Sequence, residues 1–596
     1  MKLSDYVFKF YEDKGVKNAF MLSGGGIMHL VDSLGRSNIN YICCHHEQAA
    51  SIAAQAATMY NEVPAICLST TGPGGTNALT GCAAAYVDST PEIFLSGQVK
   101  RSDYASLRGV RQFGAQENDI ISMAKPVTKY AVQINDPDKI RYELEKSFYI
   151  ATSGRKGPVW IDIPLDVQAM DIEPDSLCSF NENESIDEKK DVPDDIINEV
   201  YNTLVNSHKP VVLIGQGAVA SGAYDVIRDF INITHIPVLT TWRVQDFMDS
   251  DAKGYYGSPG LQAPRYSNLI IQNADTLLVL GSRLDNMITA FNEEHFAYKA
   301  KRIIVDIDSN EINKLNMPGK LGIVYDIKEF VSKLVDFCER NNYANNINQW
   351  IDVCELVKKK FPLLNEQQEV DDSVNLYKVT NCVSNYAQSD DVIVISSTSR
   401  CNTAGHIAFN HKKGQKTISS MGMGSMGFAI PSAVGAYFAS DNRVVVIEGD
   451  GSLQLNIQEL ETIVSNGVDA KMFIFDNRGY AAITTMQDRN FDSFYVGSNE
   501  QSKLFMPITS EISKAYGIPC YEIKTDDDIE KVVPEVFDTE GPVMCVIYGS
   551  LHFDEIPKCI SKVNEETGQR ESAVLENPYP FLTEEELESV QNILTI

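Results

Sequence analysis

The chain has 596 residues and a formal net charge of −30, with 51 Lys and Arg against 81 Asp and Glu. This balance argues against nucleic acids and anionic membranes as main partners, because both require clustered cations on the protein surface. At roughly 150 residues per domain, the length allows about four domains, or three larger ones.

Residues 1–18 carry acidic side chains and have no apolar core, so they do not resemble a secretory signal. No apolar run approaches the length of a membrane span. The 12 cysteines are scattered without a CxxC pair, which indicates reduced, mostly buried thiols. We therefore expect a cytoplasmic enzyme.

The first 175 residues alternate short β-rich runs with helical stretches, including an alanine-rich helix over residues 49–57. Strands separated by helices are typical of parallel sheets covered on both faces. The predicted strands of this block are 41–44, 65–71, 92–96 and 158–164.

A polar, acidic stretch at 173–195 predicts a linker, and residues 339–369 predict a second, partly helical connection. Two α/β blocks follow the first linker, with predicted strands at 210–215, 276–281, 302–306, 392–396, 444–448 and 472–475. An acidic helix should begin near Thr583. We predict three doubly wound parallel-sheet α/β domains, 1–175, 195–340 and 370–552, and a tail, 553–596.

The run Val444–Ile447 is β-branched throughout and leads into Glu448–Ser452, while the next predicted strand ends just before Asn477. A right-handed crossover makes the two strands parallel neighbours or nearly so, which brings Asp450 and Asn477 to the carboxyl edge where α/β folds bind ligands. A carboxylate and an amide oxygen suit Mg²⁺ with a bound phosphate.

The glycines of the Gly449-Asp450-Gly451 turn would let backbone amides approach that phosphate, beside a helix N-terminus. A lone GDG is more often a simple turn. The strand, the helix, the second strand and Asn477 together favour the metal site.

A second motif competes with this interpretation. Residues 422–427 form a GxGxxG sequence, and Glu448 follows about twenty residues later, which is the pattern of a dinucleotide-binding domain. The preceding residues 417–420 make a weak strand, so the motif alone is weak support.

Upstream, His46-Glu47-Gln48 stands at a strand-to-helix junction, and Thr71–Asn77 follows the next strand. Here the chain resembles the thiamine diphosphate (ThDP)-dependent enzymes of the acetolactate synthase group, over roughly residues 3–550. The matching motifs also include Ser96-Gly97-Gln98, Ala115-Gln116-Glu117, Gly157–Gln168, Gly281-Ser282-Arg283 and the GDG…DN element.

The resemblance implies a pyrimidine-binding domain, a central nucleotide-type domain and a diphosphate-binding domain. Glu47 would hydrogen-bond the aminopyrimidine ring and shift its tautomer; without the resemblance, a charge favoured by the helix dipole would be the better interpretation. The implied Mg²⁺ ligands are Asp450, Asn477 and the Gly479 carbonyl. Other implied cofactor contacts are Pro73, Asn77, Gly424, Met426, Gly449, Gly451 and Ser452.

Gly25, Gly26 and Gln116 match positions that line the reactive carbon, although Gln116 could instead be an ordinary solvated residue. His45 and His46 are better explained as structural. The central domain resembles the flavin-binding domain of acetolactate synthases. Arg155 and Arg283 match positions that contact FAD in those enzymes, and Asp306 could meet a ribose or adenine. Relatives hold other nucleotides or nothing there, and surface ion pairs would explain the arginines equally well.

Departures from the family concern the acceptor. Met287 replaces the arginine that holds the carboxylate of a second 2-keto acid, and losing such a contact should cost a few kcal/mol. Ser399–Asn402 replaces the usual Gly-Gln-His-Gln beside the diphosphate. The other departures are Leu165 for lysine, Ala115 for phenylalanine, Met486 for tryptophan, and the small Ala482.

We therefore expect a ThDP- and Mg²⁺-dependent carboligase that decarboxylates a 2-keto acid, most simply pyruvate. It would transfer the two-carbon carbanion to an uncharged carbonyl acceptor, by analogy a nucleotide-linked ketosugar. The alternatives are an acetolactate synthase, an NAD-dependent dehydrogenase and a non-catalytic ThDP-fold binding protein. The resemblance also implies a homodimer or homotetramer with ThDP between subunits.

Overall fold

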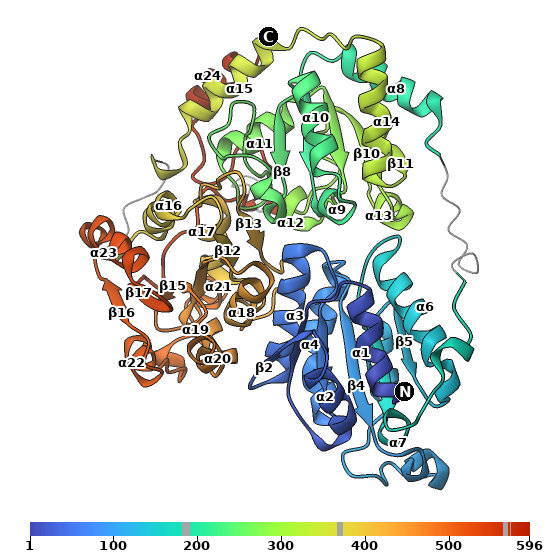
Figure 1. The fold of residues 1–596 in the computed structure, drawn as a ribbon. Helices are drawn as coiled ribbons and strands as arrows, with labels where there is room; N and C mark the ends of the chain where they lie inside the picture. The colour runs from blue at the N-terminus through green and yellow to red at the C-terminus, as the bar shows by residue number, and fades with distance from the viewer. Residues whose placement is uncertain (182–190, 366–372, 564–569, 572–573, 596) are drawn as a thin grey trace. The chain divides into compact units, whose positions relative to one another are not determined.

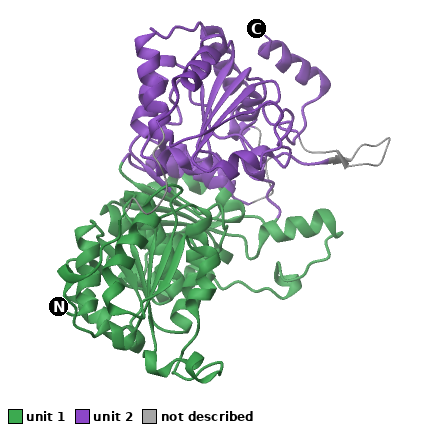
Figure 2. Ribbon diagram, turned by 90° about the vertical axis from the view of Figure 1, so that its right-hand side faces the viewer, with its two compact units in different colours: residues 1–187, 390–402, 418–551 green, residues 188–389, 403–417, 552–596 purple. Residues whose placement is uncertain are grey.

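The computed structural model describes residues 1–181, 191–365, 373–563, 570–571 and 574–595. The chain divides into two compact units, shown in Figure 2. The first contains residues 1–187, 390–402 and 418–551, and the second contains residues 188–389, 403–417 and 552–596. Three parallel sheets run through these units (Figure 1), so the predicted three-sheet α/β class is confirmed.

The first sheet has six strands in the order β2-β1-β3-β4-β6-β5. Successive residues of its strands enter two different apolar clusters, because both faces of the sheet are buried under helices. Its strands are β1 (Asn18–Met21), β2 (Asn40–Cys43), β3 (Ile66–Ser69), β4 (Ile93–Gln98), β5 (Tyr130–Gln133) and β6 (Val159–Pro164). Its helices are α1 (Leu3–Asp13), α2 (Met28–Gly35), α3 (Glu47–Asn61), α4 (Pro73–Val87), α5 (Ile120–Ala124), α6 (Ile140–Thr152) and α7 (Leu165–Gln168).

The sheet of the C-terminal part also has six strands, in the order β13-β12-β14-β15-β17-β16. The strands are β12 (Val392–Ile395), β13 (Lys416–Ile418), β14 (Val444–Gly449), β15 (Ala470–Asp476), β16 (Cys520–Ile523) and β17 (Val543–Tyr548). The helices are α17 (Ser399–Ile407), α18 (Ala429–Ser440), α19 (Asp450–Leu453), α20 (Glu459–Ser465), α21 (Ala481–Asn490), α22 (Thr509–Ala515) and α23 (Asp526–Asp538).

Within the first unit, α3 packs closely against α18. A Cβ atom on Gly435 would lie only 2.0 Å from the backbone oxygen of Ala53, so the two helix backbones approach where both side chains are minimal. This contact lets one apolar cluster extend from the first sheet to the C-terminal one. The alanine-rich composition of α3 thus serves helix packing.

The second unit contains a five-stranded sheet in the order β11-β10-β9-β7-β8. Its strands are β7 (Pro210–Ile214), β8 (Val238–Thr240), β9 (Thr276–Leu280), β10 (Lys301–Asp306) and β11 (Leu321–Val324). Its helices are α8 (Asp194–Val205), α9 (Gln216–Ala220), α10 (Tyr224–Thr234), α11 (Arg265–Gln272), α12 (Asn286–Thr289), α13 (Ser309–Asn313), α14 (Ile327–Arg340), α15 (Asn348–Lys360), α16 (Leu376–Tyr386) and α24 (Glu584–Leu594).

The C-terminal tail belongs to this second unit. Leu575, Val590 and Leu594 are buried in its apolar core, and the guanidinium of Arg265 donates to the backbone oxygens of Pro578 and Pro580. The short antiparallel pair β18 (Lys562–Val563) and β19 (Arg570–Glu571) precedes this segment. The tail therefore completes the core of the central sheet.

The predicted strands are confirmed to within a few residues, and the acidic helix predicted near Thr583 is α24, for which Thr583 forms a capping box. Part of the predicted linker, residues 182–190, lies outside the described residues, as do residues 366–369 of the second connection. That connection contains α15, which buries Trp350 in the core of the second unit. All 12 cysteines are free thiols, and most are buried, as predicted. In the described ranges no helix is long and apolar enough to cross a membrane.

Candidate active site

Two neighbouring strands of the C-terminal sheet end in acidic and amide side chains. β14 and β15 pair in parallel, so Asp450 and Asn477 leave the sheet at the same edge, as the sequence predicted. The buried carboxylate of Asp450 accepts hydrogen bonds from the backbone N–H groups of Gly451 and Arg478, both at 2.8 Å. Asp450 thereby joins the two strand ends.

The pocket around Asp450 is rich in acceptor oxygens. Oδ1 of Asn477 is buried and accepts no hydrogen bond from the residues that the structure describes. Burial, and then the nearby carboxylate of Asp476, raises the pKa of Asp450 to about 7. A divalent cation would coordinate Oδ1 of Asn477 and would stabilise the ionised form of Asp450. Carboxylate and amide oxygens are the ligands that Mg²⁺ prefers. These residues therefore fit a magnesium ion.

The glycines beside Asp450 stand where a side chain would collide with the site. A Cβ atom on Gly451 would lie 2.6 Å from the ring of Tyr480, and one on Gly479 would lie 2.7 Å from the backbone oxygen of Ser498. The backbone of both turns therefore lies close to its neighbours at positions where only glycine fits.

The glycine-rich loop 420–427 is fastened to the GDG turn. Oγ of Ser452 accepts a hydrogen bond from the N–H of Gly427 at 2.8 Å, and the side chain of Asn456 donates to the Gly427 oxygen at 2.7 Å. Gly424 has φ +62°, a conformation that favours glycine, and Met426 beside it is half-buried. The predicted cofactor contacts Gly424, Met426 and Ser452 thus belong to one connected structure.

The same loop is held from the other side by Asp88, the residue that follows α4. Its carboxylate accepts hydrogen bonds from Ser420 Oγ at 2.5 Å and from the N–H of Gly422 at 3.2 Å. The side chain of Gln55, from α3, also donates to it at 3.2 Å. Asp88 therefore links the helices of the first sheet to the glycine-rich loop.

Glu47 is the first residue of α3 and is 8% exposed. Its Oε2 accepts a hydrogen bond from Asn77 at 2.9 Å, and its Oε1 lies near Gly74. Pro73 occupies the first turn of α4, where its missing N–H costs nothing. His46 caps α3 by accepting from the N–H of Gln48. The structure thus brings Glu47, Asn77 and Pro73 together, and gives His46 the structural role expected for it.

Gly26 and Gln116 both contact the turn between β3 and α4. The N–H of Gly26, in the short 3₁₀ turn Gly25–Ile27, donates to Thr70 Oγ1 at 3.3 Å. Gln116 is exposed and has φ +66°. Its backbone oxygen would lie 2.3 Å from a Cβ on Gly72, so only glycine permits this approach. The predicted residues around the reactive carbon therefore gather at one turn.

A buried polar network supports that turn. The carboxylate of Asp162 accepts from Ser96 Oγ at 2.6 Å and from Gln133 at 2.9 Å. Gln98 contacts the same carboxylate at 3.4 Å and donates to the backbone oxygen of Asn118, in the loop of Gln116. Burial raises the pKa of Asp162 to about 6, against the lowering effect of these hydrogen bonds.

Comparisons with known proteins agree with this arrangement. Three thiamine pyrophosphate enzyme domains match the chain: the N-terminal TPP binding domain at residues 1–123, the central domain at 197–334 and the C-terminal TPP binding domain at 398–547. The acetolactate synthase large subunit of Cyanidium caldarium is 32% identical over 548 residues, which cover 89% of this chain and 91% of that protein.

The chain belongs to the ThDP-dependent enzymes of the acetolactate synthase-like group. Two further relatives are large subunits from bacteria. The acetolactate synthase isozyme 1 large subunit of Escherichia coli (strain K12) is 28% identical over 91% of this chain and 92% of its own length. The large subunit from Lactococcus lactis subsp. lactis (strain IL1403) is 29% identical over 93% and 95%.

The family matches help to interpret the GxGxxG sequence at residues 422–427. The C-terminal TPP binding match covers residues 422–427, which supports a role for this loop in ThDP binding rather than in a dinucleotide site. Both TPP binding matches lie largely in the first unit, where the structure also places Glu47 and Asp450.

The three residues predicted to contact FAD fall in different units. In the first unit, Nε of Arg155 donates to Ser89 Oγ at 3.1 Å. In the second, Arg283 follows β9 and forms an ion pair with Asp285 at 3.5 Å, and Asp306 ends β10 beside it. Arg283 and Asp306 therefore stand at the carboxyl edge of the central sheet, where α/β folds bind nucleotides.

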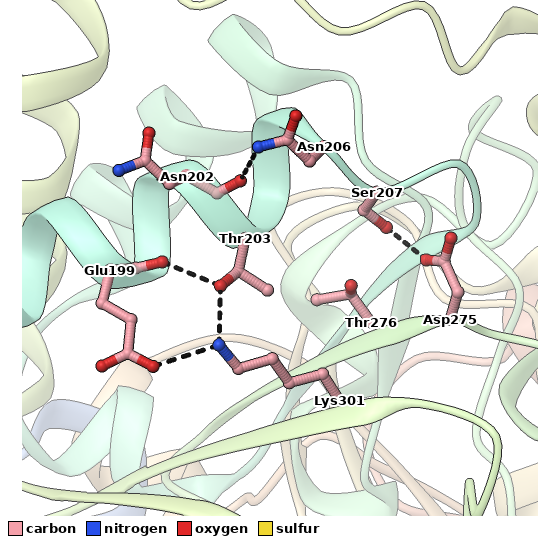
Figure 3. Close-up of a pocket in the computed structure, with 8 residues that line it drawn as sticks. All are labelled: Glu199, Asn202, Thr203, Asn206, Ser207, Asp275, Thr276 and Lys301. Atoms are coloured by element: carbon pink, nitrogen blue, oxygen red, sulfur yellow. Dashed lines mark hydrogen bonds and ion pairs between the residues drawn. The ribbon is translucent and has the colours of Figure 1, made fainter.

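A surface hollow in the second unit, drawn in Figure 3, lies at the opposite edge of that sheet. It is lined by α8 and by the starts of β9 and β10. Its cation, Lys301, donates to Glu199 and Thr203, both at 3.0 Å. Because these charged groups satisfy one another at the amino ends of the strands, we assign no ligand to this hollow.

Sequence reasoning missed several residues that organise the site. Asp88 and Asn118 act through contacts with residues distant in the chain, and no local motif marks them. Asp162 lies within the Gly157–Gln168 motif, but the motif does not indicate its hydrogen bonds to Ser96 and Gln133. Asp476 directly precedes the predicted Asn477, and a second carboxylate beside a metal ligand could have been noticed. Arg400 is 2% exposed and contacts α21 and the segment that follows β17.

Proposed function

We propose that this enzyme decarboxylates a 2-keto acid, most simply pyruvate, and transfers the two-carbon unit to a bulky, uncharged carbonyl acceptor. A nucleotide-linked ketosugar is the acceptor class that we favour. The donor half of this proposal rests on the family, because relatives that align along most of the chain carry the name acetolactate synthase. The acceptor half rests on this chain's own residues.

The absence of a carboxylate-binding arginine is the observation that carries the acceptor proposal. Met287 takes that place, on the short α12 after β9, and is 37% exposed. An apolar side chain cannot repay the desolvation of a second carboxylate. Ala115 and Ala482 are exposed, and each is smaller than the residue expected there. Compared with the residues that the resemblance leads us to expect, these three positions therefore offer an acceptor less bulk or less positive charge.

The chain's residues divide the catalytic tasks. ThDP, when bound, supplies the electron sink for breaking and forming the carbon–carbon bond. Asn77 engages Oε2 of Glu47, so we assign Oε1 to the proton shared with the aminopyrimidine ring. Asp450, Asn477 and the Gly479 carbonyl would hold Mg²⁺, and Gly424 and Met426 would support the cofactor. Gln116, Gly25 and Gly26 would orient the substrate carbonyl.

Two further features are part of the proposal. The central domain is proposed as a nucleotide site, with FAD as the first candidate and Arg283 and Asp306 as its contacts, while Arg155, which lies in the first unit, remains a contact that the resemblance implies. A flavin spectrum of the purified protein tests it. The assembly is proposed as a homodimer or homotetramer with ThDP between subunits, and sedimentation of the loaded protein tests it.

The decisive experiment supplies ¹³C-labelled pyruvate with ThDP, Mg²⁺ and a panel of aldehyde, 2-keto acid and nucleotide-linked ketosugar acceptors. Mass spectrometry should find a labelled two-carbon addition to an uncharged acceptor, with labelled CO₂ released. Glu47→Gln should abolish it, because that side chain can no longer share the proton. Wild-type protein that adds label to none of the uncharged acceptors contradicts the proposal.

Acetolactate synthase is the second candidate, because relatives with that name align over about nine-tenths of the chain at 28–32% identity. Pyruvate alone should then give acetolactate at a rate that exceeds every uncharged-acceptor reaction. The same panel distinguishes the two functions, since each predicts a different labelled product.

A further inference from the structure

Arg400 is a charged residue buried at the start of α17, close to the proposed diphosphate site. The next residue, Cys401, places its sulfur 3.3 Å from where a Cβ on Gly449 would lie. A guanidinium in this position could be expected to bind a phosphate oxygen. Its contacts instead lead to other elements.

Both terminal nitrogens of Arg400 donate to protein groups within the first unit. Nη1 donates to the backbone oxygen of Ser550 at 2.5 Å, and Nη2 donates to that of Leu551 at 2.7 Å. Nη2 also donates to Oγ1 of Thr485 at 2.8 Å. The segment that follows β17 and the middle of α21 are therefore held by one planar cation.

The helix α21 has little apolar packing to hold it. Ala481, Thr484 and Gln487 are its buried residues, whereas Ile483 and Met486 are 40% and 45% exposed. A short helix with so few buried apolar contacts depends on its polar anchors for a fixed position.

One anchor lies on the buried side of α21. The side chain of Gln487 donates to the Val496 oxygen at 3.0 Å and accepts from Ser498 Oγ at 2.7 Å. Arg400 supplies a further anchor, through Thr485. Its partner Thr485 lies three positions after Ala482 and directly before Met486, so an anchor at Thr485 fixes the stretch of α21 that carries both residues.

We infer that Arg400 is a positioning residue that clamps α21 through Thr485 and so fixes Ala482 and Met486 at the acceptor pocket. This inference rests on the proposed function, which places those two residues at the acceptor. Arg400 acts through Thr485 and the 550–551 segment and is not a ligand of the cofactor diphosphate.

The test compares Arg400→Gln with Thr485→Val, which removes the hydroxyl and keeps the arginine, and with Thr485→Ser, which keeps the hydroxyl. Arg36→Gln is the matched control, because Arg36 is an exposed arginine paired with Asp32 on α2. The first measurement is hydrogen–deuterium exchange over residues 481–490, in cofactor-free and in ThDP-loaded protein. The second is a set of steady-state constants for donor and acceptor, with ThDP affinity from calorimetry.

We expect Arg400→Gln and Thr485→Val to speed exchange in α21 about tenfold or more in both states. The KM for the acceptor should rise roughly ten- to a hundredfold, since small misplacements of contact residues are costly. The KM for the donor and the Kd for ThDP should change by less than about twofold. Thr485→Ser and Arg36→Gln should match the wild type.

Unchanged exchange in α21 for both Arg400→Gln and Thr485→Val overturns the clamp. A large loss of ThDP affinity in Arg400→Gln, without a similar loss in Thr485→Val, also overturns the clamp. The guanidinium would then bind the cofactor diphosphate. If Arg400→Gln does not fold, the comparison of Thr485→Val with Thr485→Ser tests the clamp by itself. If the proposed function is wrong, the wild-type protein makes no carboligation product. The hydrogen–deuterium exchange measurements do not depend on that activity, so the two failures can be told apart.

Discussion

At the scale of single residues, the site depends on buried oxygens whose surroundings set their chemistry. Asp450 connects two strand ends through backbone N–H groups, and Asn477 offers an oxygen that the described protein does not use. Asp162 is fully buried in a different network, which reaches the loop of Gln116 through Gln98. Each of these groups permits a direct test.

Replacing Asn477 with alanine should weaken Mg²⁺-dependent ThDP binding about tenfold or more, because the magnesium site would lose one of its few protein oxygens. Titration calorimetry at fixed Mg²⁺ measures this effect. Asn466→Ala, at the exposed end of α20, is the control and should bind ThDP normally. Equal affinities for the two variants would remove Asn477 from the metal site.

Asp162 should make stability depend on pH. Its pKa is about 6 in the fold and 3.8 ordinarily, so the fold binds this proton more tightly than the unfolded chain does. The stability contributed by the protonated group is therefore full below about pH 4, falls as the pH rises to about 6, and is constant above it, a change of about 3 kcal/mol. The midpoint of thermal unfolding should be lower for Asp162→Asn than for the wild type, and it should change less with pH across this window. Asp138→Asn, an exposed control, should retain the wild-type slope.

At the scale of secondary-structure elements, loops are held by helices distant in sequence. Asp88 follows α4 and grips the loop 420–427 by two hydrogen bonds, and that loop is fastened in turn to α19 through Ser452. The conformation of the cofactor loop therefore depends on helices of the first sheet as well as on its own glycines.

Asp88→Ala should leave the buried donors of Ser420 and Gln55, and the N–H of Gly422, without this acceptor, at a cost of about 3 kcal/mol. We expect a lower unfolding midpoint, faster proteolysis within residues 420–427 and roughly tenfold weaker ThDP binding. Asp13→Ala, at the exposed end of α1, is the matched control for an aspartate at a helix end. If the loop of Asp88→Ala resists protease as well as the wild type, the link is unimportant.

At the scale of the whole molecule, one compact unit carries both Glu47 and Asp450, while a second unit carries the central sheet and the C-terminal tail. The proposed assembly would give each cofactor a Glu47 from one chain and an Asp450 from another. Symmetric pairing of two chains then creates two equivalent sites.

Two inactive variants should therefore complement each other. Co-expressed in equal amounts, Glu47→Ala and Asp450→Ala chains should form mixed dimers with one intact site, which restores about a quarter of wild-type activity when half the dimers are mixed. Each variant alone should remain inactive. Mixed dimers, verified by two affinity tags, that show no activity would mean that both residues come from one chain.

Local sequence patterns predicted most of the strands, because continuous β-branched runs are typical of strands buried on both faces. They missed β1, β5, β8, β11 and β16, which are short, and β17, a clear apolar run that lies between β15 and β16 in the sheet. The order of motifs identified the family, and the placement of Asp450 and Asn477 at adjacent strand ends followed from crossover rules. No comparable rule predicts the contacts of Asp88 and Arg400 from the sequence.

The sequence by itself determined the fold class, the family and the strand-end position of the proposed metal ligands, since each depends on periodicity or on residues a short distance apart. Its charge of −30 excluded polyanion partners, yet it is compatible with a diphosphate site built from backbone amides and a magnesium ion. Only the tertiary structure decided that Asp88 holds Ser420, 332 positions away, and that Arg400 holds α21. The physical reason is that hydrogen bonds between distant segments depend on how the sheets and helices pack, and no local pattern in the sequence records that packing.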